Sequence, residues 1–443
     1  MSRDYLCRRG SLRGINSECI DLIYLDPPFN KNKKFTAPIG SSAEGTSFKD
    51  IFREEDVKDE WLITIKEDQP ELYHYLNGIR GVGNPYNFAY LAYMAIRLIE
   101  CHRVLKKTGS IYLHCDPTMS HYLKTTLDCI FGEKNYLNEI IWCYIDPAGR
   151  KNSAYYKRTH DIVFWYTKSK RHHQVYEIAK SPLSESTIKR YNKYFDKYGK
   201  LTYARLKETN PGAFRSLKSV PADLNEVWLD KNAGTTAPDW WTEFTPIKRK
   251  GGNQESESVG YPTQKPLALI ERIIKTSSNE EYMVLDPFCG CATTCVAAEH
   301  LNRQWIGIDI SIVAYDLVRD RLTNEVANPG HILQFRNQIN LKTDPPKRTD
   351  LDVDYREQKF VYIISHPSYP GEYKVGIAKN AQLRLVAYQT ADPERAYKIK
   401  YKLETPHFRE IEKHIHEIFP NKHEWVQREL NEIIKAIENY KLE

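Results

Sequence analysis

The sequence predicts an α/β protein with one mostly parallel sheet, interrupted by an insertion and followed by a second, smaller α/β domain. Three observations predict this. Apolar strand-like runs alternate with helical periodicity in two separate stretches, which is typical of a parallel sheet covered on both faces. A basic stretch of weak periodicity lies between them, and a polar, proline-bearing segment precedes the last strands. The 443 residues allow two or three domains of roughly 150 residues each.

The first stretch, from about Ile15 to Lys168, contains two expected strands. Residues 21–25 form an apolar strand, and residues 110–115 form a second one. Between them, residues 87–106 carry apolar side chains three and four positions apart, which predicts a long helix that ends before Gly109.

The second stretch returns to regular periodicity after Gly260. Helices are expected at residues 267–277, 292–301 and 311–324, with strands at 283–286 and 305–309. Neither stretch has enough strands for a sheet of its own. We therefore expect both to contribute to one sheet.

The stretch between Arg150 and Lys250 is strongly basic. It holds 21 Lys and Arg against 10 Asp and Glu, a balance of +11, so the net charge of +6 leaves −5 for the rest of the chain. Its cations are interleaved with tyrosines and tryptophans, a combination that suits phosphates and exposed bases. A solvated, lysine-rich surface is the alternative interpretation. The nearby motifs favour nucleic acid.

The domain boundaries follow from these shifts in composition. We expect a first domain over 1–341 with an insertion at about 150–250, a linker over 342–359, and a last domain over 360–443. No cysteine follows Cys295, which disfavours a zinc finger in that last domain. No apolar run approaches the ~18 residues of a membrane span and no signal peptide opens the chain, so we expect a cytoplasmic protein without membrane contact.

The first chemical motif is Asp26-Pro27-Pro28-Phe29, which follows the apolar strand at 21–25. Two prolines fix a rigid turn and remove two N–H donors. The Asp26 carboxylate and a carbonyl oxygen of the turn can then accept both hydrogens of a planar amino group, while Phe29 stacks on its ring. An enzyme that acts on a flipped base needs this arrangement. A plain strand end with a proline turn is the structural alternative.

Two further motifs lie in the second stretch. Asp286, Phe288 and Gly290 close one strand and open a helix, where open α/β sheets bind cofactors. Asp309 ends the next strand, a position suited to ribose hydroxyls. An ordinary strand–helix–strand unit is the alternative. The third motif, Thr263-Gln264-Lys265-Pro266, precedes them.

Together these motifs resemble the amino-methyltransferases of DNA, in the permuted order that places the catalytic half first. The resemblance spans roughly Ile15 to Asn328 and implies a Rossmann-like sheet, S-adenosylmethionine as methyl donor and double-stranded DNA with a flipped target base as partner. A homodimer is compatible with it. By this resemblance Asp26, Pro27, Pro28 and Phe29 hold the target amine, while the basic stretch is the target-recognition region. An aspartate in first position favours adenine N6 over cytosine N4.

The same resemblance implies a cofactor site built from both later motifs. Asp286, Phe288, Gly290 and Asp309 would line it, and Thr263, Gln264, Lys265 and Pro266 would complete its methionine end. Two departures from the family pattern stand out. The stretch Tyr5–Gly10 lacks the acid expected before the catalytic strand, and Cys291 replaces a common glycine.

The last domain carries a second set of candidates. Tyr362 lies in an apolar strand, Lys374 in the next, Arg384 in a helical stretch, and Glu412 in a later helix. This pattern resembles the GIY-YIG nucleases, in a branch with lysine in the second motif. It implies that Glu412 holds one Mg²⁺, that Tyr362 or a base beside it helps activate water, and that Arg384 neutralises phosphoryl charge. A DNA-binding module without cleavage is the alternative.

The combined expectation is a single-chain restriction–modification protein, an adenine-N6 methyltransferase with a Mg²⁺-dependent endonuclease domain. A solitary methyltransferase of adenine N6 or cytosine N4, whose tail only binds DNA, is the second hypothesis. A DNA-binding protein without catalysis is the third, prompted by the two departures from the family pattern.

Overall fold

The computed structural model describes residues 4–7, 11–37, 43, 47–82, 84–144, 154, 156–247, 257–309, 312–325, 339–342, 359–378, 381–390, 392–405, 407–422 and 424–440. The expected linker therefore lies outside the described residues except at its two ends, which belong to strands. No helix in these ranges has the length and apolar character that a membrane crossing requires.

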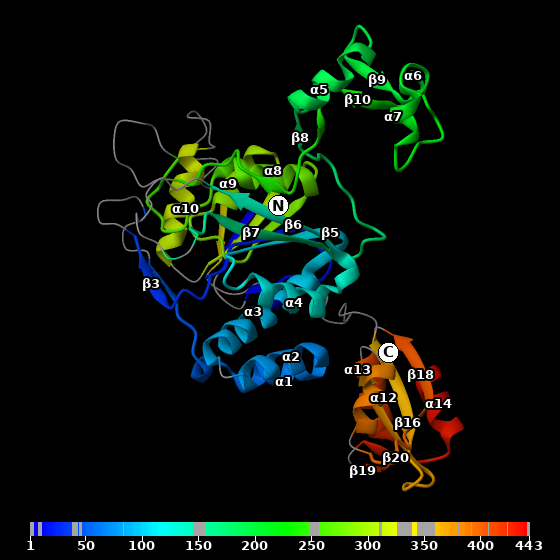
Figure 1. The fold of residues 1–443 in the computed structure, drawn as a ribbon. Helices are drawn as coiled ribbons and strands as arrows, with labels where there is room; N and C mark the ends of the chain where they lie inside the picture. The colour runs from blue at the N-terminus through cyan, green and yellow to red at the C-terminus, as the bar shows by residue number, and fades with distance from the viewer. Residues whose placement is uncertain are drawn as a thin grey trace.

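A nine-stranded sheet forms the centre of the first domain (Figure 1). In spatial order the strands are β12 (Trp240–Trp241), β6 (Tyr136–Cys143), β7 (His160–Thr167), β5 (Leu105–Cys115), β2 (Ile20–Leu25), β13 (Met283–Asp286), β14 (Gln304–Ile308), β1 (Asp4–Cys7) and β15 (Ile339–Lys342). All neighbours run parallel except β7, which is antiparallel to both β5 and β6. The pairing of Leu22 with Val284 joins the two stretches and confirms the prediction of one shared sheet.

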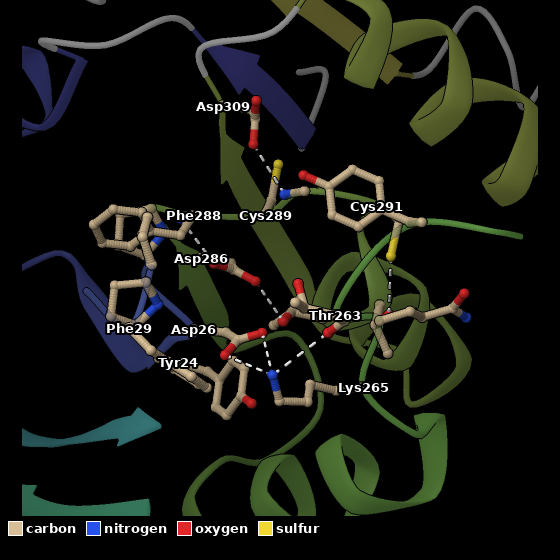
Figure 2. Close-up of a pocket in the computed structure, with 18 of the residues that line it drawn as sticks. Tyr24, Asp26, Phe29, Thr263, Lys265, Asp286, Phe288, Cys289, Cys291 and Asp309 are labelled. Atoms are coloured by element: carbon tan, nitrogen blue, oxygen red, sulfur yellow. Dashed lines mark hydrogen bonds and ion pairs between the residues drawn. The ribbon is translucent and has the colours of Figure 1, made fainter. Parts of the chain in front are cut away.

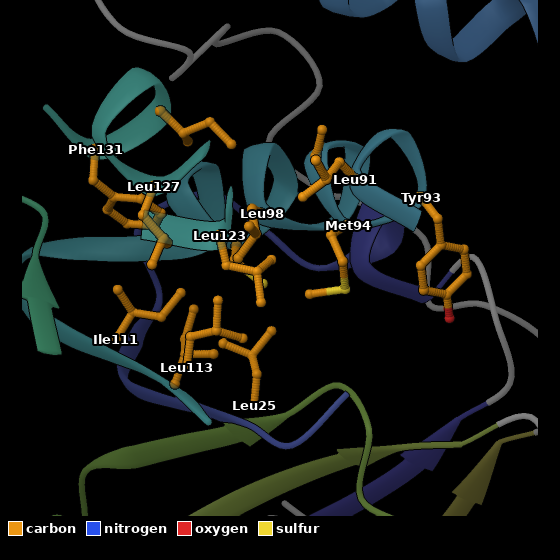
Figure 3. Packing of buried hydrophobic residues seen from close by; sticks show 14 of the residues in the cluster. Leu25, Leu91, Tyr93, Met94, Leu98, Ile111, Leu113, Leu123, Leu127 and Phe131 are labelled. Carbon is orange, nitrogen blue, oxygen red and sulfur yellow. The ribbon is translucent and has the colours of Figure 1, made fainter. Parts of the chain in front are cut away.

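Helices cover both faces of this sheet. One face carries α1 (Asp59–Asp68), α2 (Pro70–Gly81), α3 (Pro85–Val104) and α4 (Ser120–Phe131), and the other carries α8 (Leu267–Ser277), α9 (Thr293–His300) and α10 (Ile312–Glu325). Figure 3 shows Leu25, Ile111 and Leu113 of the sheet facing α3 and α4. Leu22 and Tyr24 point the other way, because successive strand residues face opposite sides.

Strand β5 is longer than the sequence predicts. It begins at Leu105 directly after α3 and passes through Gly109, which the sequence suggests as a helix end. A Cβ at Gly109 would lie 2.7 Å from Cδ1 of Leu105 and 2.8 Å from the Asp21 carbonyl oxygen. The glycine therefore permits close strand packing here.

The basic insertion forms a small unit with its own core. It comprises β8 (Lys180–Ser181), α5 (Glu185–Tyr191), β9 (Lys200–Thr202), α6 (Tyr203–Thr209), α7 (Pro211–Arg215), β10 (Val227–Asp230) and β11 (Thr235–Thr236). Leu183, Leu201 and Leu206 are buried in that core, and Figure 1 shows the unit standing off the sheet. Two strands within the predicted window of about 150–250 belong to the central sheet and not to this unit. They are β7, which is buried on both faces, and β12, which pairs with β6 at the sheet edge.

Several shorter elements complete the first domain. A hairpin of β3 (Lys33–Thr36) and β4 (Ser47–Asp50) follows the first chemical motif. Single turns of 3-10 helix lie at Ser11–Gly14, Glu54–Asp56, Glu133–Asn135 and Asn192–Tyr194.

The last domain has a five-stranded antiparallel sheet. Its order is β18 (Lys398–Thr405), β16 (Lys359–Ser365), β17 (Glu372–Ala378), β20 (Trp425–Gln427) and β19 (Asn421–Lys422). Val361 and Ile363 pack against α13 (Phe408–Ile418) and α14 (Leu430–Glu438) on one face. Tyr362 and Ile364 pack against α12 (Ala381–Thr390) on the other.

Candidate functional site

The three motifs of the first domain line one cavity of about 360 Å³ at the carboxyl ends of β2, β13 and β14. From the predicted set it is lined by Asp26, Pro27, Pro28, Phe29, Thr263, Gln264, Lys265, Asp286, Phe288, Gly290 and Asp309. Pro266 does not line the cavity and instead occupies the N-cap position of α8. Motifs about 240 residues apart therefore meet because β2 and β13 are neighbours.

Asp26 follows the last residue of β2 and contacts Lys265 (Figure 2). The Lys265 Nζ donates to both carboxylate oxygens at 2.7 Å and lies 3.4 Å from the Thr263 carbonyl oxygen. The same Nζ lies 5.2 Å from the centre of the Phe29 ring. The first and third motifs are thus one structural unit.

The loop that carries Phe29 is anchored by Asp50 at the end of β4, which the sequence did not single out. Its buried carboxylate accepts hydrogen bonds from the backbone N–H groups of Phe29, Asn30 and Lys31 at 3.2, 2.6 and 2.9 Å. Burial raises the pKa of Asp50, although the three N–H donors act in the opposite direction. In the sequence Asp50 is one acid among lysines, and no pattern there indicates that it anchors this loop.

A buried polar chain supports Phe29 from behind. The His114 ring stacks on Phe29 with centroids 5.9 Å apart, and its Nδ1 lies 2.9 Å from the Tyr24 hydroxyl. Its Nε2 lies 3.3 Å from Asp161, which also accepts from Tyr144 at 3.3 Å. Burial acts to raise the pKa of Asp161, but the hydrogen bond with His114 and the charges nearby outweigh it and lower that pKa.

Asp286 lies fully buried under the cavity. Its carboxylate accepts from the Phe288 N–H at 3.0 Å and from the Thr294 hydroxyl at 2.5 Å. Burial, reinforced by the charges of Asp26 and Asp309, raises its pKa to about 7. The Asp309 carboxylate accepts from the Gly290 N–H at 3.0 Å, so it fixes the turn between β13 and α9.

Gly290 and the neighbouring cysteines shape the cavity wall. Gly290 has a φ of +49°, and a Cβ there would lie 3.1 Å from the Tyr261 ring. A Cβ at Gly307 would lie 3.2 Å from the Cys289 sulfur and 3.1 Å from that of Cys295, so these thiols are packing groups. Across the described ranges, no cluster of three or more His, Cys, Asp or Glu side chains is arranged to hold a metal.

The basic insertion places cations beside aromatic rings. Lys193 Nζ lies 5.0 Å from the ring centre of Tyr194, Lys197 lies 4.9 Å from that of Tyr198, and Lys231 lies 4.6 Å from that of Phe195. Tyr198 is 64% exposed. Such pairs offer charge to phosphates and flat surfaces to bases.

Three of the four predicted residues of the last domain meet on the α12 face of its sheet. The Tyr362 hydroxyl lies 3.1 Å from that of Tyr388, and Arg384 lies 5.3 Å from the Tyr388 ring centre. Lys374 lies 5.4 Å from the same ring and pairs with Glu424 at 2.8 Å. Burial acts to lower the pKa of Lys374, but the hydrogen bonds to Glu424 and Tyr388 outweigh it and raise that pKa. Tyr388 is therefore the centre of the group, although no motif marked it.

Glu412 lies elsewhere. It belongs to α13, whose residues Phe408, Ile411 and Ile415 pack on the opposite face of the sheet from Tyr362. The expected Mg²⁺ centre on Glu412 therefore has no support from the described arrangement.

Comparison with known proteins identifies the first domain. A sequence profile described as DNA methylase matches residues 20–320, more than half of the chain. The chain belongs to the DNA methylase family. A second profile, the T5orf172 domain, matches residues 359–441 of this DNA methylase, which is the last domain.

Relatives of this DNA methylase match over most of their own length. The type II methyltransferase M.EcaI of Enterobacter cloacae is 28% identical over 348 residues, 70% of this chain and 71% of that protein. The DNA adenine methyltransferase YhdJ of Escherichia coli K12 is 27% identical over 304 residues, 68% of this chain and 75% of that protein. Among solved structures, a putative DNA modification methylase of Thermus thermophilus, complexed with S-adenosyl-L-methionine, covers 74% of this chain and 96% of its own, with 15% identity and a TM-score of 0.37.

Proposed function

We propose that this DNA methylase transfers a methyl group from S-adenosylmethionine to adenine N6 in double-stranded DNA. The observation that carries the proposal is the cavity lined together by Asp26, by the turn that follows Asp286 and by Asp309. An amine-accepting carboxylate and a site for a nucleoside at the sheet edge are what this reaction needs.

The cavity suits the methyl donor in its chemistry. Asp309 offers carboxylate oxygens at the end of β14 for ribose hydroxyls, and Phe288 and Tyr261 offer aromatic faces. The positive φ of Gly290 keeps a side chain out of the space beside Tyr261. S-adenosylmethionine bound there would supply a methyl carbon on a positively charged sulfur, and the S–C bond would be exchanged for the new N–C bond.

The residues of the chain prepare the amine. Asp26 and the Pro27 carbonyl oxygen accept hydrogen bonds from its two N–H groups, which favours a tetrahedral nitrogen whose lone pair is less delocalised into the ring and is directed at the methyl carbon. After transfer the nitrogen carries an extra proton, which it releases to the Asp26 carboxylate. Phe29, held between His114 and the cavity, stacks on the flipped base. Fixed placement of the amine against the methyl carbon supplies most of the rate enhancement.

The test is sequencing, with base-modification detection, of DNA from a host that expresses the chain. N6-methyladenine in one sequence motif is the expected result, and N4-methylcytosine alone would contradict adenine as the target. Asp26→Ala should abolish methylation and retain the far-UV circular dichroism of the wild type.

We further propose that the T5orf172 domain acts on the same DNA as an endonuclease, which would make the chain a restriction–modification protein. The cluster of Tyr362, Lys374, Arg384 and Tyr388 supports this, because it gathers two cations and two phenols where a phosphodiester could bind. Glu412 belongs to α13 on the other face of the sheet, so the proposal rests on this cluster alone. Incubation of unmethylated DNA with the protein, with and without Mg²⁺, tests cleavage. Binding without cleavage in either condition would leave a DNA-binding domain.

A further inference from the structure

The ion pair between Lys265 and Asp26 occupies the oxygens that the target amine needs. Both Asp26 oxygens accept from Nζ at 2.7 Å, and the two side chains are only 8% and 18% exposed. Figure 2 shows Lys265 reaching Asp26 from the segment before α8. A contact this close and this well shielded from water restrains the rotation of the carboxylate.

The carboxylates around Asp26 make a neighbouring cation favourable. Asp286 on β13, Asp309 after β14 and Asp161 on β7 line the same cavity, so Asp26 is placed among other acids. Lys31, the other lysine of the cavity, pairs with Asp116 instead. Lys265 therefore provides the positive charge that contacts Asp26 directly.

We propose that Lys265 is a positioning residue on the methyl-acceptor side of the site: it orients the Asp26 carboxylate before DNA binds and yields one oxygen to the amine of the flipped base. This rests on the proposed methyl transfer, and it moves Lys265 away from the methionine end of the cofactor, where the sequence resemblance placed it. The contacts of Nζ with Asp26, the Thr263 carbonyl and the Phe29 ring all lie on the amine side.

Lys265 should also affect how strongly the site prefers a base with an amino group over one without. The amine of an entering base competes with the two charge-assisted hydrogen bonds between Lys265 and Asp26, which are stronger than neutral ones. An amino group replaces the bond that is given up, whereas a base without one leaves both Lys265 bonds in place. With Lys265 present, the amine therefore adds little to the binding free energy of the base. Without Lys265, the amine adds the full free energy of its hydrogen bond to the Asp26 oxygen.

The experiment compares Lys265→Met, Lys265→Arg and a matched control, Lys107→Met, which removes an exposed charge on β5. For each variant we would measure S-adenosylmethionine affinity by calorimetry, the single-turnover methylation rate at saturating cofactor, and affinity for DNA carrying either adenine or purine at the methylated position. Purine lacks the amino group, so the adenine-to-purine ratio isolates the amine contact.

For Lys265→Met we expect unchanged cofactor affinity, a rate lowered about a hundredfold through misorientation of Asp26, and a higher adenine-to-purine ratio. Lys265→Arg should recover part of the rate and the wild-type ratio, and Lys107→Met should match the wild type in all three. Weaker cofactor binding with an unchanged rate at saturation would overturn the proposal, as would an unchanged ratio in both Lys265 variants. If the wild type itself methylates nothing, the proposed function fails instead.

Discussion

Replacing Asp286 by asparagine should stabilise the first domain, and the gain should grow with pH. Asp286 is fully buried, and burial raises its pKa to about 7 from an ordinary value of 3.8. Asparagine has nearly the same shape. Its Oδ1 can accept from the Phe288 N–H, and its Nδ2 can donate to the Thr294 hydroxyl, which reverses the present bond.

The direction of the change in stability with pH follows from proton binding. Between pH 3.8 and about 7 the folded chain keeps a proton on Asp286 that the unfolded chain has released, so the free energy of unfolding falls as pH rises through this range. At about 1.4 kcal/mol per pKa unit, the wild type loses about 2 to 3 kcal/mol between pH 5 and pH 8 from this group. Asp286→Asn does not titrate and is spared this loss.

The assay is urea unfolding at pH 5 and pH 8, followed by tryptophan fluorescence, for both proteins. Trp305 is fully buried in the core beside β13 and reports on this domain. We expect the free energy difference between variant and wild type to be about 2 to 3 kcal/mol larger at pH 8. A difference that is equal at both pH values, or larger at pH 5, would refute the reasoning.

Three further changes test other parts of the structure. Asp50→Asn replaces one acceptor oxygen by an NH2 donor that faces the backbone N–H groups of Phe29, Asn30 and Lys31, so methylation should fall about tenfold or more in a steady-state assay, while calorimetry shows cofactor binding retained. Gly376→Ala would place Cβ 2.7 Å from the Tyr362 hydroxyl and should destabilise the last domain by about 1 to 3 kcal/mol in thermal unfolding, with relief when Tyr362→Phe is added. Alanine at both Lys193 and Lys197 should weaken DNA binding and lower the slope of log affinity against log salt by roughly one for each phosphate that is no longer neutralised; an unchanged slope would remove these lysines from the DNA interface.

The central sheet was predictable because its signals are local. Residues 21–25 and 283–286 are short apolar runs bounded by turn residues, and their parallel pairing follows from the helices between strands. Each strand ends at a chemical motif. Since the carboxyl ends of parallel strands share one sheet edge, the convergence of Asp26 and Asp286 on one cavity could also be inferred.

The parts that escaped prediction depend on contacts between distant segments. Asp50 matters because strand β4 brings its carboxylate to the backbone of the loop that carries Phe29, and nothing in the neighbouring sequence marks that contact. Tyr388 matters because α12 places it against Tyr362, Lys374 and Arg384. Glu412 stands out in the sequence by its place along the chain, and the face of the sheet that α13 covers could not be read from periodicity alone.

Lys265 shows how the order of motifs along the chain leaves the role of a residue open. It lies only 21 residues before Asp286, which groups it with the cofactor half in the sequence. In the folded chain β13 is the neighbour of β2, so the segment before α8 passes the ends of both strands. A side chain at that junction can contact either Asp26 after β2 or the turn after β13. The contacts of the Lys265 Nζ favour the first of these. Its two 2.7 Å bonds go to Asp26, 239 residues away, which is why we propose that Lys265 orients the Asp26 carboxylate.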